Sequence, residues 1–287
     1  MDSKRLGTTE IEISAIGLGG MPLSLSTRPP VAQALAVIHR ALDLGVTLID
    51  TADSYCQDES DKHHNERLIT KALQHYQGDT SQVTVATKGG LMRPRGEWTS
   101  NGNPEHLRET IRASYEALAG PITLWQYHSP DPNYTIAESL APVKAAVAEG
   151  LVRYVGVSNF SVEQIERARE VVEIVSVQNQ YNPWHRQPEF DGVLEYCEQE
   201  QLTFFPYRPL RGRFKVDSVA ENEAIAELAA AKGVSPYQIV LAWHRAKSPC
   251  IVPIPGATKP ASIESSVGSV AVNLSPEEVQ QIDKSGS

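Results

Sequence analysis

Residues 45–55 read Gly45-Val-Thr-Leu-Ile-Asp-Thr-Ala-Asp-Ser-Tyr55, and this stretch decides the fold that we expect. The apolar, partly β-branched run at 46–49 is typical of a fully buried parallel strand. The run stops at Asp50, and Tyr55 follows after a short polar segment. Because aspartate is almost never buried without a partner, a carboxylate at the end of such a strand indicates chemistry rather than packing. One buried strand therefore brings an acid and a phenol to the same rim.

Segments typical of strands and helices alternate around this stretch. The expected strands span residues 16–21, 46–49, 83–87, 122–127, 154–157, 174–178, 203–206 and 251–254. The expected helices span residues 31–44, 65–75, 104–118, 136–149, 161–171, 189–201, 219–232 and 235–246, with two more starting near 260 and 275. Eight strand–helix units predict an α/β protein, a (β/α)8 TIM barrel of about 250 residues with extra helices. A β-hairpin is expected ahead of it at residues 4–13.

We expect one domain over residues 1–287, because no linker or low-complexity stretch divides the chain. A doubly wound open sheet is the alternative fold. It is disfavoured because no G-x-G-x-x-G opens a helix after the first strand.

Composition limits the classes of partner. The chain has 287 residues, is 41% hydrophobic and carries a net charge of -9, which disfavours nucleic acid and anionic membranes as partners. The three cysteines have no metal-ligand spacing and are typical of a reducing, cytoplasmic compartment. The first residues lack a signal-peptide pattern, and no apolar run reaches the ~18 residues of a membrane helix. We expect a cytoplasmic monomer.

Catalytic groups of a barrel lie at the carboxyl ends of its strands. In chain order, those ends carry Gly20-Met21, Asp50, Lys88, His128, Ser158-Asn159, Gln178, Tyr207 and Gly256. Ionisable or protic side chains thus converge from the second, third and fourth strands, and these are Asp50, Tyr55, Lys88 and His128. We call these four residues the tetrad.

These positions belong to a recognisable set of motifs. The motifs are residues 45–55, Thr87-Lys88, Tyr127-His128, Gly156-Val-Ser-Asn159 and Gln178-Asn-Gln-Tyr-Asn-Pro183. Together they resemble the aldo-keto reductase superfamily from about residue 6 to residue 282. The resemblance implies NADPH-dependent reduction of a small-molecule carbonyl compound to an alcohol, with NADH as a weaker cofactor. Small aldehydes, aromatic aldehydes and dicarbonyls are the expected substrates.

The tetrad suits this reaction. Reduction develops negative charge on the carbonyl oxygen, so a proton donor is needed there, and Tyr55 is the candidate. Free tyrosine has a pKa of ~10, and we expect the Lys88 ammonium to lower it. Asp50 would keep the Lys88 side chain charged and directed at Tyr55. His128 would orient the carbonyl group of the substrate.

The resemblance also assigns the nicotinamide end of the cofactor. Ser158, Asn159 and Gln178 match side chains that hold the carboxamide, and Asp50 is counted among the cofactor residues with them. Tyr207 matches the ring that stacks under the nicotinamide. The backbone contacts implied are Gly20 and Met21 beside the ribose and Leu210 at the pyrophosphate.

The adenosine end departs from the family pattern. The usual lysine and arginine of the last phosphate loop are Gly256 and Ser262 here, and the usual Glu-Asn pair is Ser265-Ser266. Thr258 and Lys259 remain at a helix N-terminus, which favours an anion. Where the family usually has Tyr-Ser-Pro-Leu, this chain has Tyr207-Arg-Pro-Leu210, and further basic residues follow. These basic residues either bind a phosphate of the cofactor, as a phosphate clamp, or lie in a solvated loop. The clamp candidates are Arg208 and Arg211, with Arg213 and Lys215 nearby.

Two other functions use the same features. A class I aldolase would use Lys88 to form a Schiff base with its substrate. A non-enzymatic subunit would bind the nucleotide as a sensor. Trapping of Lys88 with borohydride in the presence of substrate, and turnover of a simple aldehyde, separate these hypotheses from a reductase.

Three features beside the tetrad have two interpretations each. Residues 58–64 are rich in Asp, Glu and His, but a solvated loop is favoured over a metal site, and we expect no metal. Cys56 is a redox-sensitive thiol or an inert loop residue. Trp98 is a wall of the substrate pocket or a ring packed on the barrel. The short segment 211–218 and the chain end at 287 predict an open pocket with broad specificity.

Overall fold

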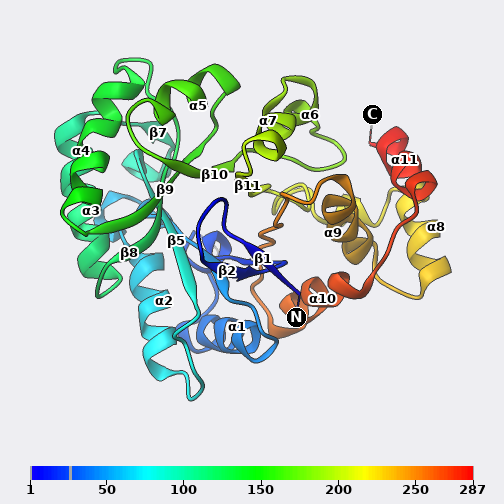
Figure 1. The fold of residues 1–287 in the computed structure, drawn as a ribbon. Coiled ribbons are helices and arrows are strands. Elements are labelled where there is room, and N and C mark those ends of the chain that lie inside the picture. Colours follow the sequence, from blue (N-terminus) through cyan, green and yellow to red (C-terminus); the bar gives the residue numbers. More distant parts are fainter. Residues whose placement is uncertain (1, 26–27, 287) are drawn as a thin grey trace.

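The computed structural model describes residues 2–25 and 28–286 of the chain. Within them, the parallel strands are β3 (Leu18–Gly19), β4 (Leu48–Asp50), β5 (Thr84–Gly89), β8 (Ile122–Tyr127), β9 (Val152–Ser158), β10 (Ile174–Gln178) and β11 (Thr203–Phe204). They form one seven-stranded sheet in the order β11-β10-β9-β8-β5-β4-β3 (Figure 1). This order follows the sequence, as expected when each strand returns through a helix to lie beside the previous one.

The predicted eighth strand is a hydrogen-bonded segment rather than a regular strand. Residues 250–255 contact both edge strands of the sheet. The amide of Phe204 donates to the carbonyl oxygen of Cys250 at 2.9 Å, and the amide of Gly19 donates to that of Pro255 at 2.9 Å. Two prolines in this segment have no amide hydrogen to donate, so a continuous ladder cannot form. The segment nevertheless bridges the two edges of the curled sheet.

Helices surround the sheet. They are α1 (Val31–Asp43), α2 (His64–His75), α3 (Pro104–Ala117), α4 (Ile136–Ala148), α5 (Val162–Arg169), α6 (Gln187–Phe190), α7 (Val193–Gln199), α8 (Glu223–Lys232), α9 (Pro236–Lys247), α10 (Pro260–Gly268) and α11 (Pro276–Ser285). The single helix predicted at 189–201 is two helices, because Gly192 has a φ of 80° and interrupts the chain between them. The helix predicted to start at residue 219 begins four residues later, after a 3-10 turn.

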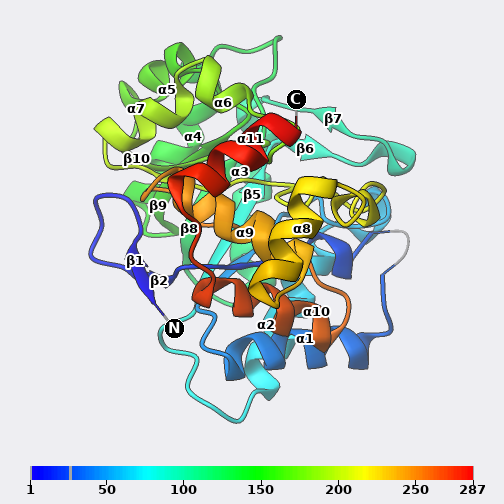
Figure 2. The same cartoon turned by 90° about the vertical axis from the view of Figure 1, so that its right-hand side faces the viewer.

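Two antiparallel hairpins lie outside the parallel sheet. The first pairs β1 (Ser3–Arg5) with β2 (Glu12–Ser14). The second pairs β6 (Leu91–Met92) with β7 (Thr99–Ser100), where the sequence predicted only a loop. Figure 2 shows the first hairpin on the left and the second on the upper right, at opposite ends of the molecule.

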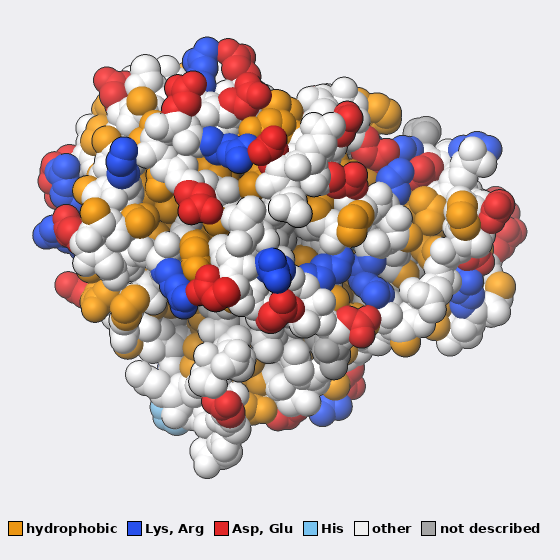
Figure 3. All heavy atoms as spheres, in the orientation of Figure 1, with side chains coloured by type: hydrophobic (Ala, Val, Ile, Leu, Met, Phe, Trp, Pro, Cys, Tyr) orange, Lys and Arg blue, Asp and Glu red, His pale blue; other side chains and the backbone are white. Residues whose placement is uncertain are grey.

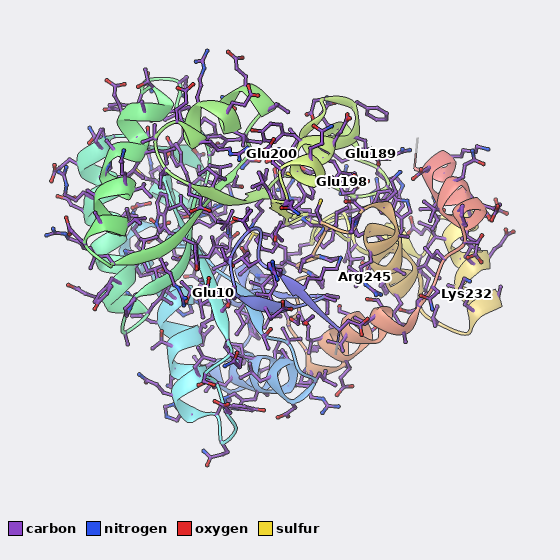
Figure 4. The ribbon with its side chains drawn as sticks, in the orientation of Figure 1. Glu10, Glu189, Glu198, Glu200, Lys232 and Arg245 are labelled. Carbon is purple, nitrogen blue, oxygen red and sulfur yellow. The ribbon has the colours of Figure 1, made fainter. Side chains whose placement is uncertain are left out.

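The first hairpin covers the amino ends of the strands. Its Leu6 and Ile13 side chains are fully buried in a cluster with sheet residues such as Leu124 and Val175. Glu10 in the hairpin turn accepts a hydrogen bond from the Tyr154 hydroxyl at 2.6 Å (Figure 4). This end of the barrel is therefore filled by side chains, and the carboxyl ends of the strands remain for function.

A half-buried polar network links the C-terminal helix α11 to α6 and α9. Glu189 on α6 accepts hydrogen bonds from the Tyr181 hydroxyl at 2.5 Å and from the Lys247 ammonium at 3.1 Å (Figure 4). Lys247 also contacts Asp283 of α11 at 2.9 Å. These contacts join α6, α9 and α11, which are distant in sequence.

The surface matches the mixed charge of the sequence. On the face drawn in Figure 3, lysine and arginine side chains are interspersed with aspartate and glutamate. Across the described ranges, no helix has the length and apolar character needed to cross a membrane.

Candidate active site

The structure brings all four tetrad residues together at the carboxyl end of the sheet. Asp50 is the last residue of β4, Lys88 lies near the end of β5, and His128 follows β8 directly. Tyr55 lies in the loop after β4. The four side chains are almost fully buried, with exposed fractions of 4% for Asp50, 6% for Tyr55, 0% for Lys88 and 7% for His128.

Lys88 is the centre of the tetrad. Its Nζ donates to Asp50 Oδ2 at 2.7 Å, to the Thr51 carbonyl oxygen at 2.8 Å and to the Tyr55 hydroxyl oxygen at 2.8 Å. An ammonium group has three hydrogens and no lone pair, so every hydrogen of Lys88 has an acceptor. Because the Tyr55 oxygen accepts from Lys88, the phenolic hydrogen is left to donate elsewhere.

The pKa of Tyr55 is raised well above its ordinary value by burial, and next by the negative charge of Asp50. This net direction corrects the expectation that Lys88 lowers the Tyr55 pKa, because burial outweighs the nearby ammonium. Burial also lowers the pKa of Lys88, although Asp50 opposes the shift. The phenol is therefore protonated at neutral pH.

His128 is a neutral ring in this site. Burial lowers its pKa well below the usual value, and Lys88 adds to the effect. The Ser54 hydroxyl lies 3.5 Å from its Nδ1. The amide nitrogen Nδ2 of Asn159 donates to the backbone carbonyl oxygen of His128 at 2.9 Å and holds that strand end in place.

The residues predicted at the nicotinamide end form one connected patch beside the tetrad. Gln178 Nε2 donates to Asp50 Oδ1 at 2.9 Å. The backbone amide of Asn159 donates to the Gln178 carbonyl oxygen at 3.1 Å. Asn159 Nδ2 contacts the Ser158 hydroxyl at 3.2 Å, and its Oδ1 accepts from the Tyr207 hydroxyl at 2.8 Å. Hydroxyl and amide groups thus lie together beside the tetrad, and they provide both hydrogen-bond donors and hydrogen-bond acceptors.

Gly20 and Met21 follow β3 at the same rim. The Gly20 amide donates to the Asp50 carbonyl oxygen at 2.7 Å, and a Cβ on Gly20 would lie 2.4 Å from Asn65 Oδ1. Asn65 Nδ2 in turn donates to the Gly20 carbonyl oxygen at 2.9 Å. The helix predicted over residues 65–75 begins at His64, so Asn65 lies in its first turn, where it is fully buried. Asn65 therefore supports the backbone at Gly20. In the sequence, the signal for this contact is an asparagine in the first turn of a helix.

The predicted adenosine-end residues are more dispersed. Arg211 stacks on Trp184, with its guanidinium carbon 4.4 Å from the ring centroid, and donates to the Ser218 hydroxyl at 2.8 Å. Arg208 is exposed, with a φ of 51°. Leu210 is half-buried against the core.

The last loop runs from Gly256 into α10. Gly256 pairs with Gly19 as an isolated bridge. Lys259 is the residue before α10, and both it and Ser262 are exposed. Gln33 of α1 donates to the Thr258 carbonyl oxygen at 2.6 Å. The Ser262 amide donates to the Lys259 carbonyl oxygen at 3.0 Å, so the end of this loop and the first turn of α10 are hydrogen-bonded to each other.

The acidic and histidine-rich segment 58–64 has its side chains engaged in separate local contacts. Asp61 pairs with Arg28 at 2.7 Å, and His63 Nδ1 lies 2.6 Å from Glu66. Within the described ranges, no group of three or more His, Cys, Asp or Glu side chains could hold a metal ion. Burial raises the pKa of the Cys56 thiol to about 12, so this cysteine is protonated and unreactive as a nucleophile.

Trp98 lies on the second hairpin, between η3 (Pro94–Gly96) and β7. Its ring meets the rings of Tyr55 and His128 edge-on, with centroids 6.4 Å and 6.2 Å apart, and 42% of the residue is exposed. A cavity of about 340 Å³ lies away from this site, at the amino ends of β5 and β8, lined among others by Val83 and Pro121.

Comparisons with known proteins agree with this geometry. A family model described as the aldo/keto reductase family matches residues 15–286. An uncharacterized oxidoreductase of Schizosaccharomyces pombe, C215.11c, is 34% identical over 297 residues, spanning 100% of this chain and 92% of the relative. The solved structure of the thermostable aldo-keto reductase Tm1743, in complex with the inhibitor epalrestat, is 30% identical with a TM-score of 0.83, covering 99% of this chain and 100% of that one. An aldo/keto reductase from Klebsiella pneumoniae, solved with NADP and acetate, shares the fold at 23% identity, with a TM-score of 0.81 over 98% of this chain and 94% of its own.

Proposed function

Because the chain belongs to the aldo/keto reductase family, we propose that it reduces aldehydes and ketones to alcohols with hydride from NADPH. The observation that carries this proposal is the arrangement around Lys88. Its ammonium donates a hydrogen bond to the Tyr55 oxygen at 2.8 Å, so the phenolic hydrogen is directed away from Lys88, next to neutral His128. The curled sheet with its bridging segment supports a (β/α)8 barrel, in a single domain.

The residues present fit a nicotinamide cofactor. A carboxamide both donates and accepts hydrogen bonds, and the patch of Ser158, Asn159 and Gln178 offers hydroxyl and amide groups that do the same. The half-buried Tyr207 ring supplies a flat face beside them. When bound, NADPH supplies the hydride that reduces the carbonyl carbon.

The proton comes from Tyr55. As negative charge grows on the carbonyl oxygen, the phenol transfers its proton to that oxygen, and the product is an alcohol. Lys88 stabilises the phenolate that forms, and Asp50 keeps the ammonium in place. A hydrogen bond from the His128 ring orients the carbonyl group. Preorganised donors of this kind act most strongly in a buried site.

We assign the phosphates of the cofactor to the last loop and the start of α10. Thr258 and Lys259 precede α10, whose first backbone amides favour an anion. Arg208, Arg211, Gly256 and Ser262 complete the proposed adenosine end. NADPH is preferred over NADH, but modestly, because the usual lysine and arginine are absent. We propose a cytoplasmic monomer that acts on small or aromatic aldehydes and dicarbonyls.

The aldolase hypothesis is disfavoured by the state of Lys88. A Schiff base requires a neutral, accessible amine, whereas Lys88 is fully buried and donates all three hydrogens to acceptors. The sensor hypothesis gives no reason for a proton donor, an ammonium group and a neutral imidazole to meet at one rim.

The test is NADPH oxidation across a panel of aldehydes, ketones and sugars, with Tyr55→Phe as the matched variant. Removal of one oxygen should lower kcat by about 10²-fold or more, because general acid catalysis contributes that much. The dissociation constant for NADPH should change little, because the phenol acts on the substrate. Near-normal turnover by Tyr55→Phe would remove Tyr55 as the acid, and no turnover of any carbonyl by the wild type would reject the reductase assignment.

A further inference from the structure

Arg93 is a buried cation that links the two loops beside the catalytic acid. It follows β6 in the second hairpin, and only 8% of it is exposed. Its guanidinium carbon lies 4.1 Å from the ring centroid of Trp98. A terminal nitrogen faces the Gln57 carbonyl oxygen at 3.5 Å, and the backbone amide donates to the carboxylate of Glu59. Both partners lie a few residues after Tyr55.

We propose that Arg93 is a positioning residue that holds the Trp98 ring against Tyr55 and His128 and so forms one wall of the substrate site. This inference rests on the proposed reductase function. Arg93 touches neither the tetrad nor the site of hydride transfer, and it acts through the indole ring.

The contacts of the guanidinium favour stacking as its main role. In the part of the chain that the structure describes, the Arg93 Nε has no hydrogen-bond partner. The contact to Gln57 is long for a hydrogen bond, whereas the distance to the indole ring is typical of a stacked guanidinium. The indole face is therefore the better-formed partner of Arg93. Arginine suits this position because its guanidinium is planar and stacks on aromatic rings while its other edge reaches a carbonyl.

The backbone around Arg93 indicates a built contact rather than a chance one. The hairpin approaches the tyrosine loop so closely that a Cβ on Gly96 would lie 3.3 Å from the Gln57 carbonyl oxygen. Gly96 has a φ of 83° and Arg95 a φ of 54°, so the turn is tightly specified. Arg93 therefore lies where the hairpin and the loop after Tyr55 meet.

The function of this contact follows from the exposure of Trp98. The ring is fixed on one face by Arg93 and meets Tyr55 and His128 edge-on, yet 42% of the residue is open to solvent. An aromatic or apolar part of a carbonyl substrate can pack on the exposed part. A ring that is held in one place binds a substrate at lower entropic cost than a mobile one.

The test compares Arg93→Met with Arg95→Met. Methionine keeps much of the length of arginine and removes the charged plane. Arg95 lies two residues away in the same turn but is exposed, so it is the matched control. For a neutral aromatic aldehyde, Arg93→Met should raise KM by about tenfold while kcat changes less than about twofold, as expected when uniform binding is lost. Arg95→Met should leave both constants near the wild-type values.

A double-mutant cycle shows whether Arg93 acts through Trp98. In a Trp98→Leu background, Arg93→Met should change kcat/KM by less than about twofold, because coupled residues are non-additive. A full tenfold loss in that background would overturn the proposal. A loss confined to 4-carboxybenzaldehyde, with benzaldehyde unaffected, would also overturn it, because Arg93 would then bind the substrate carboxylate itself.

A spectroscopic readout separates this proposal from the reductase assignment. Trp125 and Trp243 are fully buried and Trp184 is half-buried, so quenching of tryptophan fluorescence by acrylamide reports on Trp98 and Trp184, and the difference between the wild type and Trp98→Leu gives the share of Trp98. Arg93→Met should raise the quenching constant of Trp98, and Arg95→Met should not. If the wild type reduces no carbonyl, this increase still supports the proposal that Arg93 holds the Trp98 ring. An unchanged constant in a folded Arg93→Met protein would reject it, and the milder Arg93→Lys serves if Arg93→Met fails to fold.

Discussion

At the scale of single residues, the proposed catalytic site is organised around one ammonium group. Lys88 is fully buried, and an ion in such a place is costly unless it is paired and hydrogen-bonded. Asp50, Thr51 and Tyr55 supply three acceptors for its three hydrogens. The same contacts that stabilise the buried charge set the direction of the Tyr55 hydrogen.

Lys88→Met should therefore lower kcat by about 10²-fold or more, because the phenolate loses its partner and Asp50 is left unpaired. Asp50→Asn should be milder, near a tenfold loss, as expected for one charged hydrogen bond. The Asp50 charge raises the Tyr55 pKa, so its removal should move the alkaline limb of the pH–rate profile to lower pH. A profile for Asp50→Asn that superimposes on that of the wild type would contradict this coupling.

A second buried residue controls stability rather than catalysis. His244 of α9 is fully buried, its Nε2 donates to the Pro209 carbonyl oxygen at 3.2 Å, and burial lowers its pKa to about 4. In the unfolded chain the histidine pKa is ~6.5. At neutral pH the His244 ring is mostly uncharged in both the folded and the unfolded chain. As the pH falls below the unfolded pKa, only the unfolded chain gains the proton, and the native state is destabilised until the pH reaches the folded pKa.

This linkage predicts a loss of about 2 kcal/mol in the free energy of unfolding from His244 alone between about pH 7 and about pH 4.5. His244→Gln keeps a donor for Pro209 but does not titrate. The free energy of unfolding of His244→Gln at neutral pH can be lower than that of the wild type. On acidification, however, it should decrease by about 2 kcal/mol less than the free energy of unfolding of the wild type. Urea unfolding at the two pH values measures the difference, and parallel decreases would show that His244 is not responsible.

At the scale of elements, the start of α10 is the proposed phosphate site. The first amides of a helix have no partner within it, and the dipole favours an anion there. Lys259 is the residue before the helix, and it is exposed. A 2′-phosphate would therefore meet both the first amides of the helix and an ammonium group that solvent already reaches.

Lys259→Glu should raise the NADPH dissociation constant by about tenfold or more, since a charged hydrogen bond is worth ~1.5–3 kcal/mol. NADH binding should stay nearly unchanged, because it lacks the 2′-phosphate. Lys284→Glu makes the same charge change on exposed α11 and controls for net charge. Equal effects of Lys259→Glu on both cofactors would remove Lys259 from the 2′-phosphate site.

At the scale of the whole molecule, the two ends of the barrel differ. The first hairpin fills the amino end with Leu6 and Ile13, while the second hairpin stands at the catalytic end (Figure 2). Residues 205–222 join β11 to α8, and they include one 3-10 turn, Asp217–Val219. At the end that carries the tetrad, the partly exposed Trp98 ring lies against Tyr55 and His128.

This shape predicts a broad substrate range with Michaelis constants in the high micromolar to millimolar range. A shallow site buries little apolar surface, and burial is worth about 25 cal/mol per Å². Small activated aldehydes, aromatic aldehydes and dicarbonyls should be reduced, and large ketones such as steroids should be poor. The check is kcat/KM across a substrate panel. One substrate preferred by more than about 10³-fold, with a low-micromolar KM, would mean that other residues close the pocket.

The sequence alone determined the order of the elements and the identity of the tetrad. Hydrophobic periodicity is a local property, so β8 and β10 match their predicted ranges. The helix predicted from residue 161 begins at Val162, with Ser161 and Gln164 forming a capping box at its start. Catalytic groups follow strand ends by the topology of a barrel, so the positions of Asp50, Lys88 and His128 along the chain were enough to predict that they meet at one rim.

Only the tertiary structure decided the features that depend on burial and on contacts distant in sequence. The raised pKa of Tyr55 comes first from burial, which no local pattern reports. The second hairpin is short and irregular, and its Arg93 matters because it meets Trp98 and the loop after Tyr55 in space. Asn65 has the sequence pattern of a helix cap, but the fold buries it against Gly20. Local propensity specifies the elements, whereas desolvation and long-range packing determine what the side chains between them do.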